Sequence, residues 1–193
     1  MSEIKVKHPE LAGVSEDVIQ RAARVKVLLM DVDGVLTDGK LYYLQQADGK
    51  AGEVKGFNSH DGLGLHFCNR VGIKTGVISG RVSFATTERA RILKMSYVYQ
   101  DLLEKEGAYN EVLEHAQVDA SEVCFVGDDF TDVPLMRLSG LGVAVQNARQ
   151  ELHEVADYVT EVRGGEGAIR EVVELILKAQ GAWQSILEHY KLG

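Results

Sequence analysis

The sequence predicts an α/β fold, a doubly wound parallel sheet with helices on both faces. Short apolar stretches alternate with stretches of helical periodicity along most of the chain, as in parallel sheets whose strands are joined by helices. Several apolar stretches are followed directly by polar residues. In open α/β sheets, ligands bind at this position, beyond the carboxyl ends of the strands. At 193 residues the chain is long enough for a real core. We therefore expect a single domain spanning residues 1–193.

The first predicted elements are a short helix and a buried strand. Ser15 is a suitable N-cap, with Glu16 and Asp17 in the first turn of a helix that ends near Ala23. Residues 25–30 are almost entirely apolar, which predicts a buried strand.

A β-hairpin and a regular alternation of helices and strands follow. Asp48-Gly49 is a strong hairpin signal between strands predicted at 41–45 and 53–57. Further strands are predicted at 73–78, 97–99, 122–126, 142–145 and 158–160. Helices are predicted from 61 onward, at 83–94, 107–117, 132–139 and 149–156, and after a glycine loop at 164–167, with 182–190 extending or capping the last one.

The composition restricts the partners and the compartment. The net charge of −8 argues against nucleic acid or an anionic membrane as main partner, so an anionic substrate needs a locally basic pocket or a metal. Residues 1–24 lack the continuous apolar core of a secretory signal. Cys68 and Cys124 lie in apolar stretches without CxxC spacing, as reduced core thiols do. We expect a cytoplasmic protein.

Polar residues gather where predicted strands end. Because the carboxyl ends of parallel strands meet at one edge of the sheet, these residues are expected to lie together. They are Asp31 and Asp33 after the first strand, Ser79-Gly80-Arg81 after strand 73–78, Lys105 after strand 97–99, and Gly127-Asp128-Asp129 after strand 122–126.

These residue types suit phosphoryl transfer. Asp31, Asp33 and Asp128 supply the oxygen ligands that Mg²⁺ prefers, and two side chains with one backbone carbonyl suffice. The Ser79 hydroxyl, the amides around Gly80 and the Lys105 ammonium can hold a phosphoryl group. Asp31 is then the expected nucleophile, and Asp33 the acid that protonates the leaving oxygen and later activates water.

These segments resemble the four ordered motifs of the haloacid dehalogenase superfamily. The match is closer to its 3-deoxy-D-manno-octulosonate 8-phosphate (KDO 8-phosphate) phosphatases, a capless group, and extends from Val14 to Gly181. It is carried by "VSEDVIQRAARVKVLLMDVDGVLTDG", "GFNSHDGLGL", "CFVGDDFTDVPLM" and "GGEGAIREVVELILKAQG".

The resemblance implies specific roles. It assigns Mg²⁺ to Asp31, the Asp33 backbone carbonyl and Asp128, and phosphate to Ser79 and Lys105. Asp129 and Asp132 are expected to support these groups, and Gly80, Arg81, Asn58 and His60 to contact the substrate.

The spacing of the motifs leaves no room for a cap domain. Only the hairpin and one helix separate Asp31 from Ser79, and only one helix and a short strand separate Ser79 from Lys105. The site must therefore accept a macromolecule or be closed by another subunit. The resemblance implies a homotetramer in which the hairpin flap at 40–57 packs between subunits. The segment 164–193 holds the glycine loop and the C-terminal helix and tail, and the resemblance implies that the tail approaches a neighbour's site.

Two departures from the family pattern concern the substrate. Glu166 stands where an Arg or Lys is usual, and His60 where a basic residue precedes Asp-Gly. Arg81 remains and can pair with a substrate carboxylate. Related phosphatases for nine-carbon sugar-acid 9-phosphates have a Glu in this loop but tend to lack the Arg. The expected substrate is KDO 8-phosphate, an intermediate of lipopolysaccharide synthesis; a nine-carbon sugar-acid 9-phosphate is the alternative.

Other interpretations stay open at this point. A non-catalytic phosphosugar-binding or scaffolding domain is expected to lose Asp31 or Asp33, and a phosphomutase needs a lid. Ser79 can instead cap the following helix, and Lys105 can be a solvated charge at a helix start.

Overall fold

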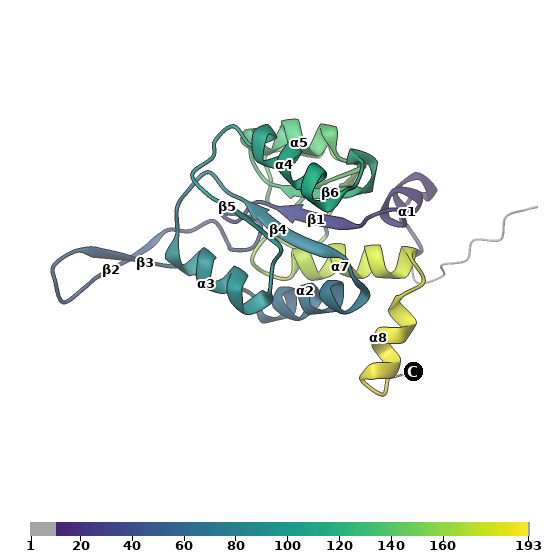
Figure 1. Cartoon of the computed structure of the whole chain (residues 1–193), viewed down its shortest axis with the longest axis horizontal. Coiled ribbons are helices and arrows are strands. Elements are labelled where there is room, and N and C mark those ends of the chain that lie inside the picture. Colours follow the sequence, from purple (N-terminus) through teal and green to yellow (C-terminus); the bar gives the residue numbers. More distant parts are fainter. Residues whose placement is uncertain (1–10, 193) are drawn as a thin grey trace, which may run out of the picture.

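The computed structural model describes residues 11–192, and its centre is a parallel sheet of six strands in the order β5-β4-β1-β6-β7-β8. A parallel sheet in this order needs a crossover between successive strands, and helices supply most of them (Figure 1). The strands are β1 (Val27–Met30), β4 (Lys74–Ile78), β5 (Tyr97–Tyr99), β6 (Val123–Gly127), β7 (Leu141–Ala144) and β8 (Tyr158–Val159). The predicted fold class is confirmed.

The register of the central strands brings their carboxyl ends to one level. Met30 of β1 pairs with Val77 of β4 on one side and with Val126 of β6 on the other. Asp31, the next residue, donates its N–H to the Val126 carbonyl at 3.0 Å. Residues that follow β1, β4 and β6 therefore emerge side by side.

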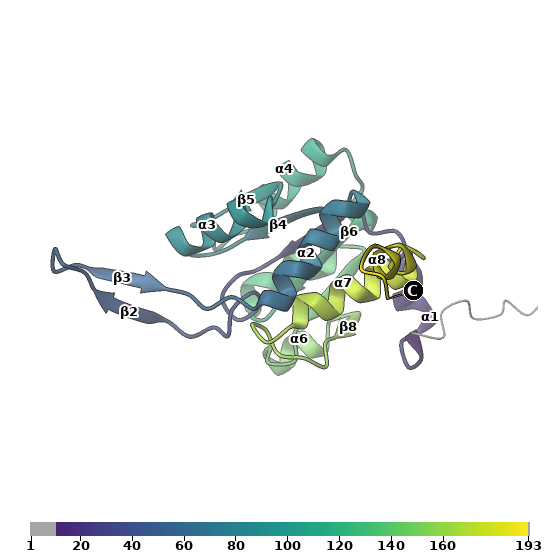
Figure 2. The same ribbon diagram turned by 90° about the horizontal axis from the view of Figure 1, so that it is seen from below.

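Helices cover both faces of the sheet (Figures 1 and 2). On one face lie α1 (Glu16–Ala22), α2 (Ser59–Val71) and α7 (Ala168–Ala179); on the other lie α4 (Glu106–Ala116) and α5 (Val133–Leu138). Successive side chains of a strand point to opposite faces, so Leu28 and Met30 enter the first core and Val27 and Leu29 the second.

The remaining helices are α3 (Phe84–Leu93), α6 (Gln150–His153), α8 (Trp183–His189) and the 3₁₀ turns η2 (Ala120–Glu122) and η3 (Phe130–Asp132). Helix α8 is separate from α7 because Gly181 has φ +67° and ends the preceding run. Trp183 of α8 packs edge-on against Phe67 of α2, with ring centroids 6.0 Å apart. No helix in the range 11–192 is long and apolar enough to cross a bilayer.

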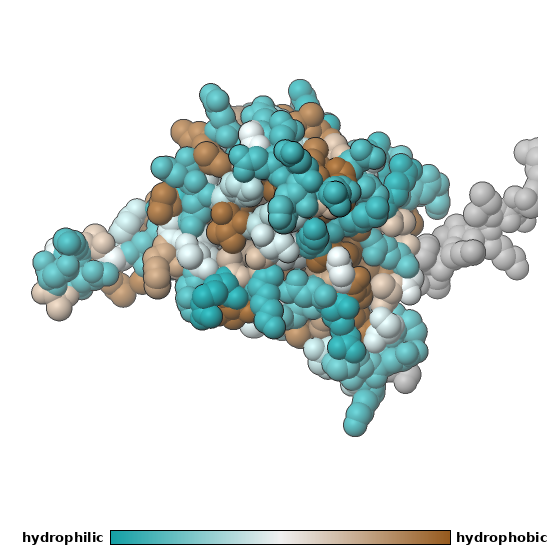
Figure 3. All heavy atoms as spheres, in the orientation of Figure 1, coloured by the Kyte–Doolittle hydropathy of each residue, from teal (hydrophilic) through white to brown (hydrophobic). Residues whose placement is uncertain are grey.

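The hairpin projects from the body as a narrow arm in both ribbon views and in the space-filling view (Figure 3). Its antiparallel strands are β2 (Tyr42–Gln45) and β3 (Ala51–Val54). Gly49 has φ +83°, and Asp48 Oδ1 accepts the Lys50 N–H, as the predicted turn requires. Most apolar side chains of these strands are exposed.

Several predicted boundaries were wrong. Strand β3 ends at Val54 rather than at residue 57, and the next side chain, Lys55, is buried. Ser83 rather than Ser79 caps α3, because the Ser83 hydroxyl accepts the Thr86 N–H. Helix α6 covers 150–153 only, and α2 begins at Ser59 with Asn58 as N-cap.

Candidate active site

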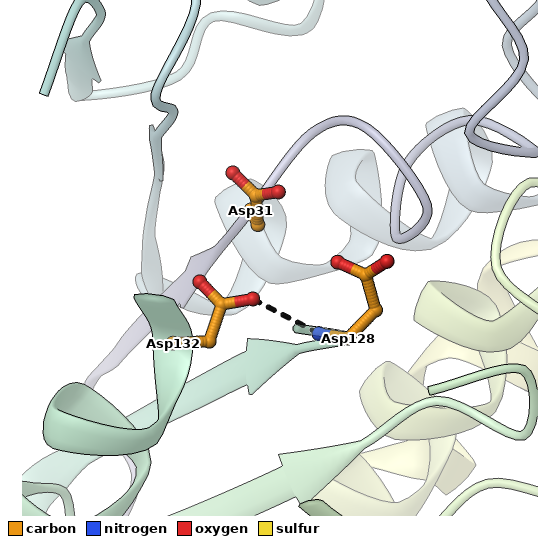
Figure 4. Close-up of side chains that lie close together, drawn as sticks. All are labelled: Asp31, Asp128 and Asp132. Atoms are coloured by element: carbon orange, nitrogen blue, oxygen red, sulfur yellow. Dashed lines mark hydrogen bonds between the residues drawn. The ribbon is translucent and has the colours of Figure 1, made fainter. Parts of the chain in front are cut away.

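Three carboxylates gather at the carboxyl edge of the sheet (Figure 4). Asp31 follows β1, Asp128 follows β6, and Asp132 ends η3. One oxygen from each carboxylate lies within 4.8 Å of the others. Like charges so close repel unless a cation lies among them.

Both carboxylate oxygens of Asp132 accept hydrogen bonds from the protein. Its Oδ1 accepts from Lys105 Nζ at 2.7 Å, and its Oδ2 accepts the N–H groups of Asp128 at 2.9 Å and Asp129 at 3.3 Å. It therefore holds the loop after β6 in place and leaves Asp31 and Asp128 as the available carboxylates. Asp129 accepts the Phe130 N–H and caps η3.

Lys105 is buried between two of these acids. Its side chain is 1% exposed, and Nζ lies 2.9 Å from Asp31 Oδ1 as well as beside Asp132. Burial alone would lower the pKa of the ammonium, but Asp132 and Asp31 outweigh it and the pKa is raised. The interpretation of Lys105 as a solvated helix-start charge was wrong.

The Lys105 ammonium alone does not neutralise the three carboxylates. Burial, and then the neighbouring Asp132, raise the pKa of Asp31 to about 6, against the opposing effect of Lys105. Burial, and then Asp132 and Asp31, raise the pKa of Asp128 to about 8. Further positive charge beside these two carboxyls would therefore favour their ionised forms.

The donor set and the local backbone fit a hard divalent cation. Asp31 and Asp128 offer the oxygen ligands that Mg²⁺ takes. Gly34 has φ +95°, and a Cβ at this position would lie 2.0 Å from Asp128 Oδ2. Any other residue would fill the space beside the Asp128 carboxylate, so the chain keeps this space open.

Asp33 lies in a closed set of four alternating charges that no sequence motif predicted. Its Oδ1 pairs with Lys55 Nζ; Lys55 is 3.7 Å from Glu53 Oε1; Glu53 Oε2 pairs with Arg81; and Arg81 Nε is 3.9 Å from Asp33 Oδ2. Glu53 and Lys55 come from the base of the hairpin. Their spacing of two residues on an extended chain was the available signal, because it places both side chains on one side.

Ser79 and Gly80 follow β4 at the same edge. The Ser79 side chain is buried, its N–H donates to Tyr99 O, and its hydroxyl accepts the Arg81 N–H at 3.4 Å. A Cβ on Gly80 would lie 3.0 Å from the Leu103 side chain. The structure therefore brings Ser79 and Arg81 to the edge where Asp31 and Asp128 lie.

The glycine loop packs directly on the loop after β1. A Cβ on Gly164 would lie 1.7 Å from the Gly34 carbonyl oxygen. Asn147 joins the two loops, although no motif in the sequence singles it out. Its Nδ2 donates to Gly34 O at 3.0 Å, and its Oδ1 accepts the Gly164 N–H.

Asn58 lies beside the glycine loop, and His60 follows it in the first turn of α2. Asn58 caps α2 by accepting the His60 N–H at 2.7 Å, and its Nδ2 contacts Gly165 O at 3.4 Å. His60 is exposed. A cavity of about 380 Å³ is lined by Asp38, Tyr42, Gly56, Phe57, Asn58, Gly165 and Glu166.

Known proteins share this sequence and fold. The family described as haloacid dehalogenase-like hydrolase matches residues 86–172. The KDO 8-phosphate phosphatase KdsC of Yersinia pestis is 42% identical over 167 residues, covering 86% of this chain and 87% of that protein. The KdsC of Escherichia coli K12 is 40% identical over 87% of each chain.

Solved structures agree. A probable YrbI family phosphatase from Pseudomonas syringae pv. phaseolica has a TM-score of 0.87 at 40% identity, covering 93% of this chain and 99% of that one. The KDO 8-phosphate phosphatase of Moraxella catarrhalis, solved with magnesium, phosphate and KDO, has a TM-score of 0.85 at 36% identity, covering 90% and 98%. The chain belongs to the KDO 8-phosphate phosphatase family of haloacid dehalogenase-like hydrolases.

Proposed function

We propose that this protein is a Mg²⁺-dependent phosphomonoesterase that hydrolyses KDO 8-phosphate to KDO and phosphate, in lipopolysaccharide precursor synthesis. The observation that carries the proposal is the cluster of Asp31, Asp128 and the buried Lys105, in a chain 42% identical to the KDO 8-phosphate phosphatase of Y. pestis. A relative solved with magnesium, phosphate and KDO supports the choice of cation and substrate.

The Mg²⁺ ligands in this proposal are the Asp31 and Asp128 carboxylates and the Asp33 carbonyl. When bound, the cation offsets negative charge on the carboxylates and on the transferring phosphoryl group. Asp132 and Asp129 hold the Asp128 loop through the contacts described above.

The protein side chains carry the proposed reaction. An Asp31 oxygen attacks phosphorus while Asp33 gives its proton to the leaving sugar oxygen, so the P–O bond to the sugar breaks and an aspartyl phosphate forms. Asp33 then takes a proton from water, which attacks phosphorus and releases phosphate from Asp31. Ser79, the Gly80 amide and Lys105 hold the phosphoryl oxygens during both steps.

The sugar-acid end of the substrate is assigned to Arg81, Asn58 and His60. One observation favours the alternative substrate, a nine-carbon sugar-acid 9-phosphate: Glu166 is exposed and lines the cavity beside Asn58, where the eight-carbon enzymes usually have a positive charge. The two substrates must therefore be compared directly.

We propose a homotetramer in which hairpins from different subunits pack together, with residues 1–193 of each forming one domain. The exposed apolar side chains of the hairpin support this assembly, since packing would remove them from water. The C-terminal tail, which follows the glycine loop and α7 within the segment 164–193, is proposed to approach a neighbouring site. A cytoplasmic location is supported by Cys68 and Cys124, which are buried free thiols.

The test is phosphate release from KDO 8-phosphate by the purified protein with Mg²⁺. We expect release to stop with a chelator, to return on adding Mg²⁺, and to fall by about 10³-fold or more in Asp31→Asn. Asp48→Asn, an exposed hairpin-turn control, is expected to keep full activity. Release that persists in Asp31→Asn would disprove the mechanism. Absence of release from any phosphate ester would favour a binding or scaffolding domain.

The substrate is tested by a parallel assay with a nine-carbon sugar-acid 9-phosphate. We expect a higher kcat/KM for KDO 8-phosphate. The reverse order would assign the enzyme to the nine-carbon substrate, and an unchanged ratio in Glu166→Arg would show that the glycine loop does not set specificity.

A further inference from the structure

Lys55 is a buried ammonium that no step of the proposed reaction uses. Its side chain is 1% exposed, although it comes directly after a partly exposed strand of the hairpin. A buried ammonium is costly unless it is paired, and among the described residues Lys55 pairs with Asp33 and lies 3.7 Å from Glu53.

The two oxygens of Asp33 face different cations. Oδ1 contacts Lys55 Nζ, while Oδ2 is 3.9 Å from Arg81 Nε, beyond hydrogen-bond distance. Glu53 links the two cations, because it pairs with Arg81 and lies beside Lys55. Lys55 therefore fixes one oxygen of Asp33 and leaves the other free to meet a substrate.

Such an arrangement matters for a proton donor. A carboxyl that protonates a leaving oxygen must lie within hydrogen-bond reach of it, at a fixed orientation. When one oxygen of a carboxylate is held by a fixed partner, the other oxygen keeps a fixed direction toward the substrate. Lys105 cannot do this for Asp33, because its ammonium contacts Asp31 and Asp132.

We propose that Lys55 is a positioning residue that orients Asp33 for proton transfer, so that the hairpin supplies part of the catalytic machinery of its own subunit. This inference rests on the proposed function, since it takes Asp33 as the acid and base. It also assigns the hairpin a chemical task in addition to its proposed place between subunits.

The test compares two phosphate esters that differ in their leaving group. A sugar alcohol leaves poorly without a proton, whereas p-nitrophenolate leaves readily without one. We therefore expect Lys55→Met to lower kcat/KM for KDO 8-phosphate by about 10²-fold and to change kcat/KM for p-nitrophenyl phosphate only slightly. Lys55→Arg, which keeps the charge, is expected to recover part of the loss.

Lys50→Met is the matched control, because Lys50 lies on the same hairpin, is 81% exposed and is 3.6 Å from Asp48. It is expected to leave both rates unchanged. Thermal unfolding of each variant checks folding, and Lys55→Gln replaces Lys55→Met if the latter does not fold.

Three results would overturn the proposal: equal losses on both esters, a higher KM with unchanged kcat, or the same loss in Lys50→Met. The second would mean that Lys55 binds substrate directly. Failure of the proposed function is separate, since wild type would then hydrolyse p-nitrophenyl phosphate but not KDO 8-phosphate. The comparison of leaving groups would then be made with whichever alkyl phosphate the wild type accepts.

Discussion

The central sheet and the hairpin are both rich in apolar residues, but these residues are buried in the sheet and exposed in the hairpin. Every residue of β1 and β7 is buried, whereas every residue of β2 is exposed, with Tyr43 at 59% and Leu44 at 62%. The sheet is stabilised by its own helices through two cores. The hairpin contributes little to either core, so its apolar side chains are available for contacts outside the subunit.

The largest expected effect concerns the stability of the subunit. Leu29 of β1 is fully buried, so Leu29→Ala is expected to reduce the free energy of unfolding by about 2–5 kcal/mol. Leu44→Ala, the same change on the hairpin, is expected to alter it by less than about 0.5 kcal/mol in the isolated subunit. Urea unfolding at low protein concentration measures the free energy of unfolding of both variants. A comparable loss in Leu44→Ala would show that the hairpin contributes to the stability of the subunit as the sheet does.

A smaller effect is expected on assembly. Each large apolar side chain buried between subunits contributes about 1.5–3 kcal/mol. If the proposed tetramer forms through the hairpins, the double variant Tyr43→Ser/Leu44→Ser is therefore expected to weaken it without unfolding the subunit. Light scattering after size-exclusion chromatography gives the mass. Leu138→Ser is the control, because Leu138 is 49% exposed on α5 in the body. A tetramer that persists in the double variant would exclude the hairpin as its interface.

The smallest effect is confined to a range of pH. Asp61 of α2 accepts the Arg170 N–H at the start of α7, its Oδ2 has no partner among the described residues, and burial raises its pKa to about 6 from 3.8. The folded state therefore binds the proton more tightly, so the contribution of Asp61 to stability is fully present below pH 4 and is lost as pH rises through 6.

Asp61→Asn keeps the acceptor and removes the titration. We expect the variant to gain stability relative to wild type as pH rises from 4 to 7, measured by urea unfolding at each pH. A difference that stays constant over this range would show that Asp61 does not titrate there.

The sheet and most of its site could be predicted because both depend on local order in the chain. Apolar stretches predicted the strands. Because ligands bind beyond the carboxyl ends of parallel strands, the positions of Asp31, Ser79, Lys105 and Asp128 after these strands predicted that they share one edge of the sheet. Lys55 and Glu53 could not be placed, because their partners depend on how the hairpin leaves the body. Asn147 was missed for a similar reason, since it joins two loops far apart in sequence.

The close packing of the glycine loop affects how this enzyme can evolve. Gly164 and Gly165 lie against the backbone of residues 34–38, where even one added carbon would collide, so neither can change without displacing the loop after β1. Glu166 between them and Gly167 is exposed at the rim of a cavity. A single substitution at Glu166 can therefore reverse the charge at the rim of this cavity without disturbing the packing of the two loops. If this cavity receives the sugar end of the substrate, as proposed, substrate preference can change at this one position while the residues proposed to carry out the reaction stay the same.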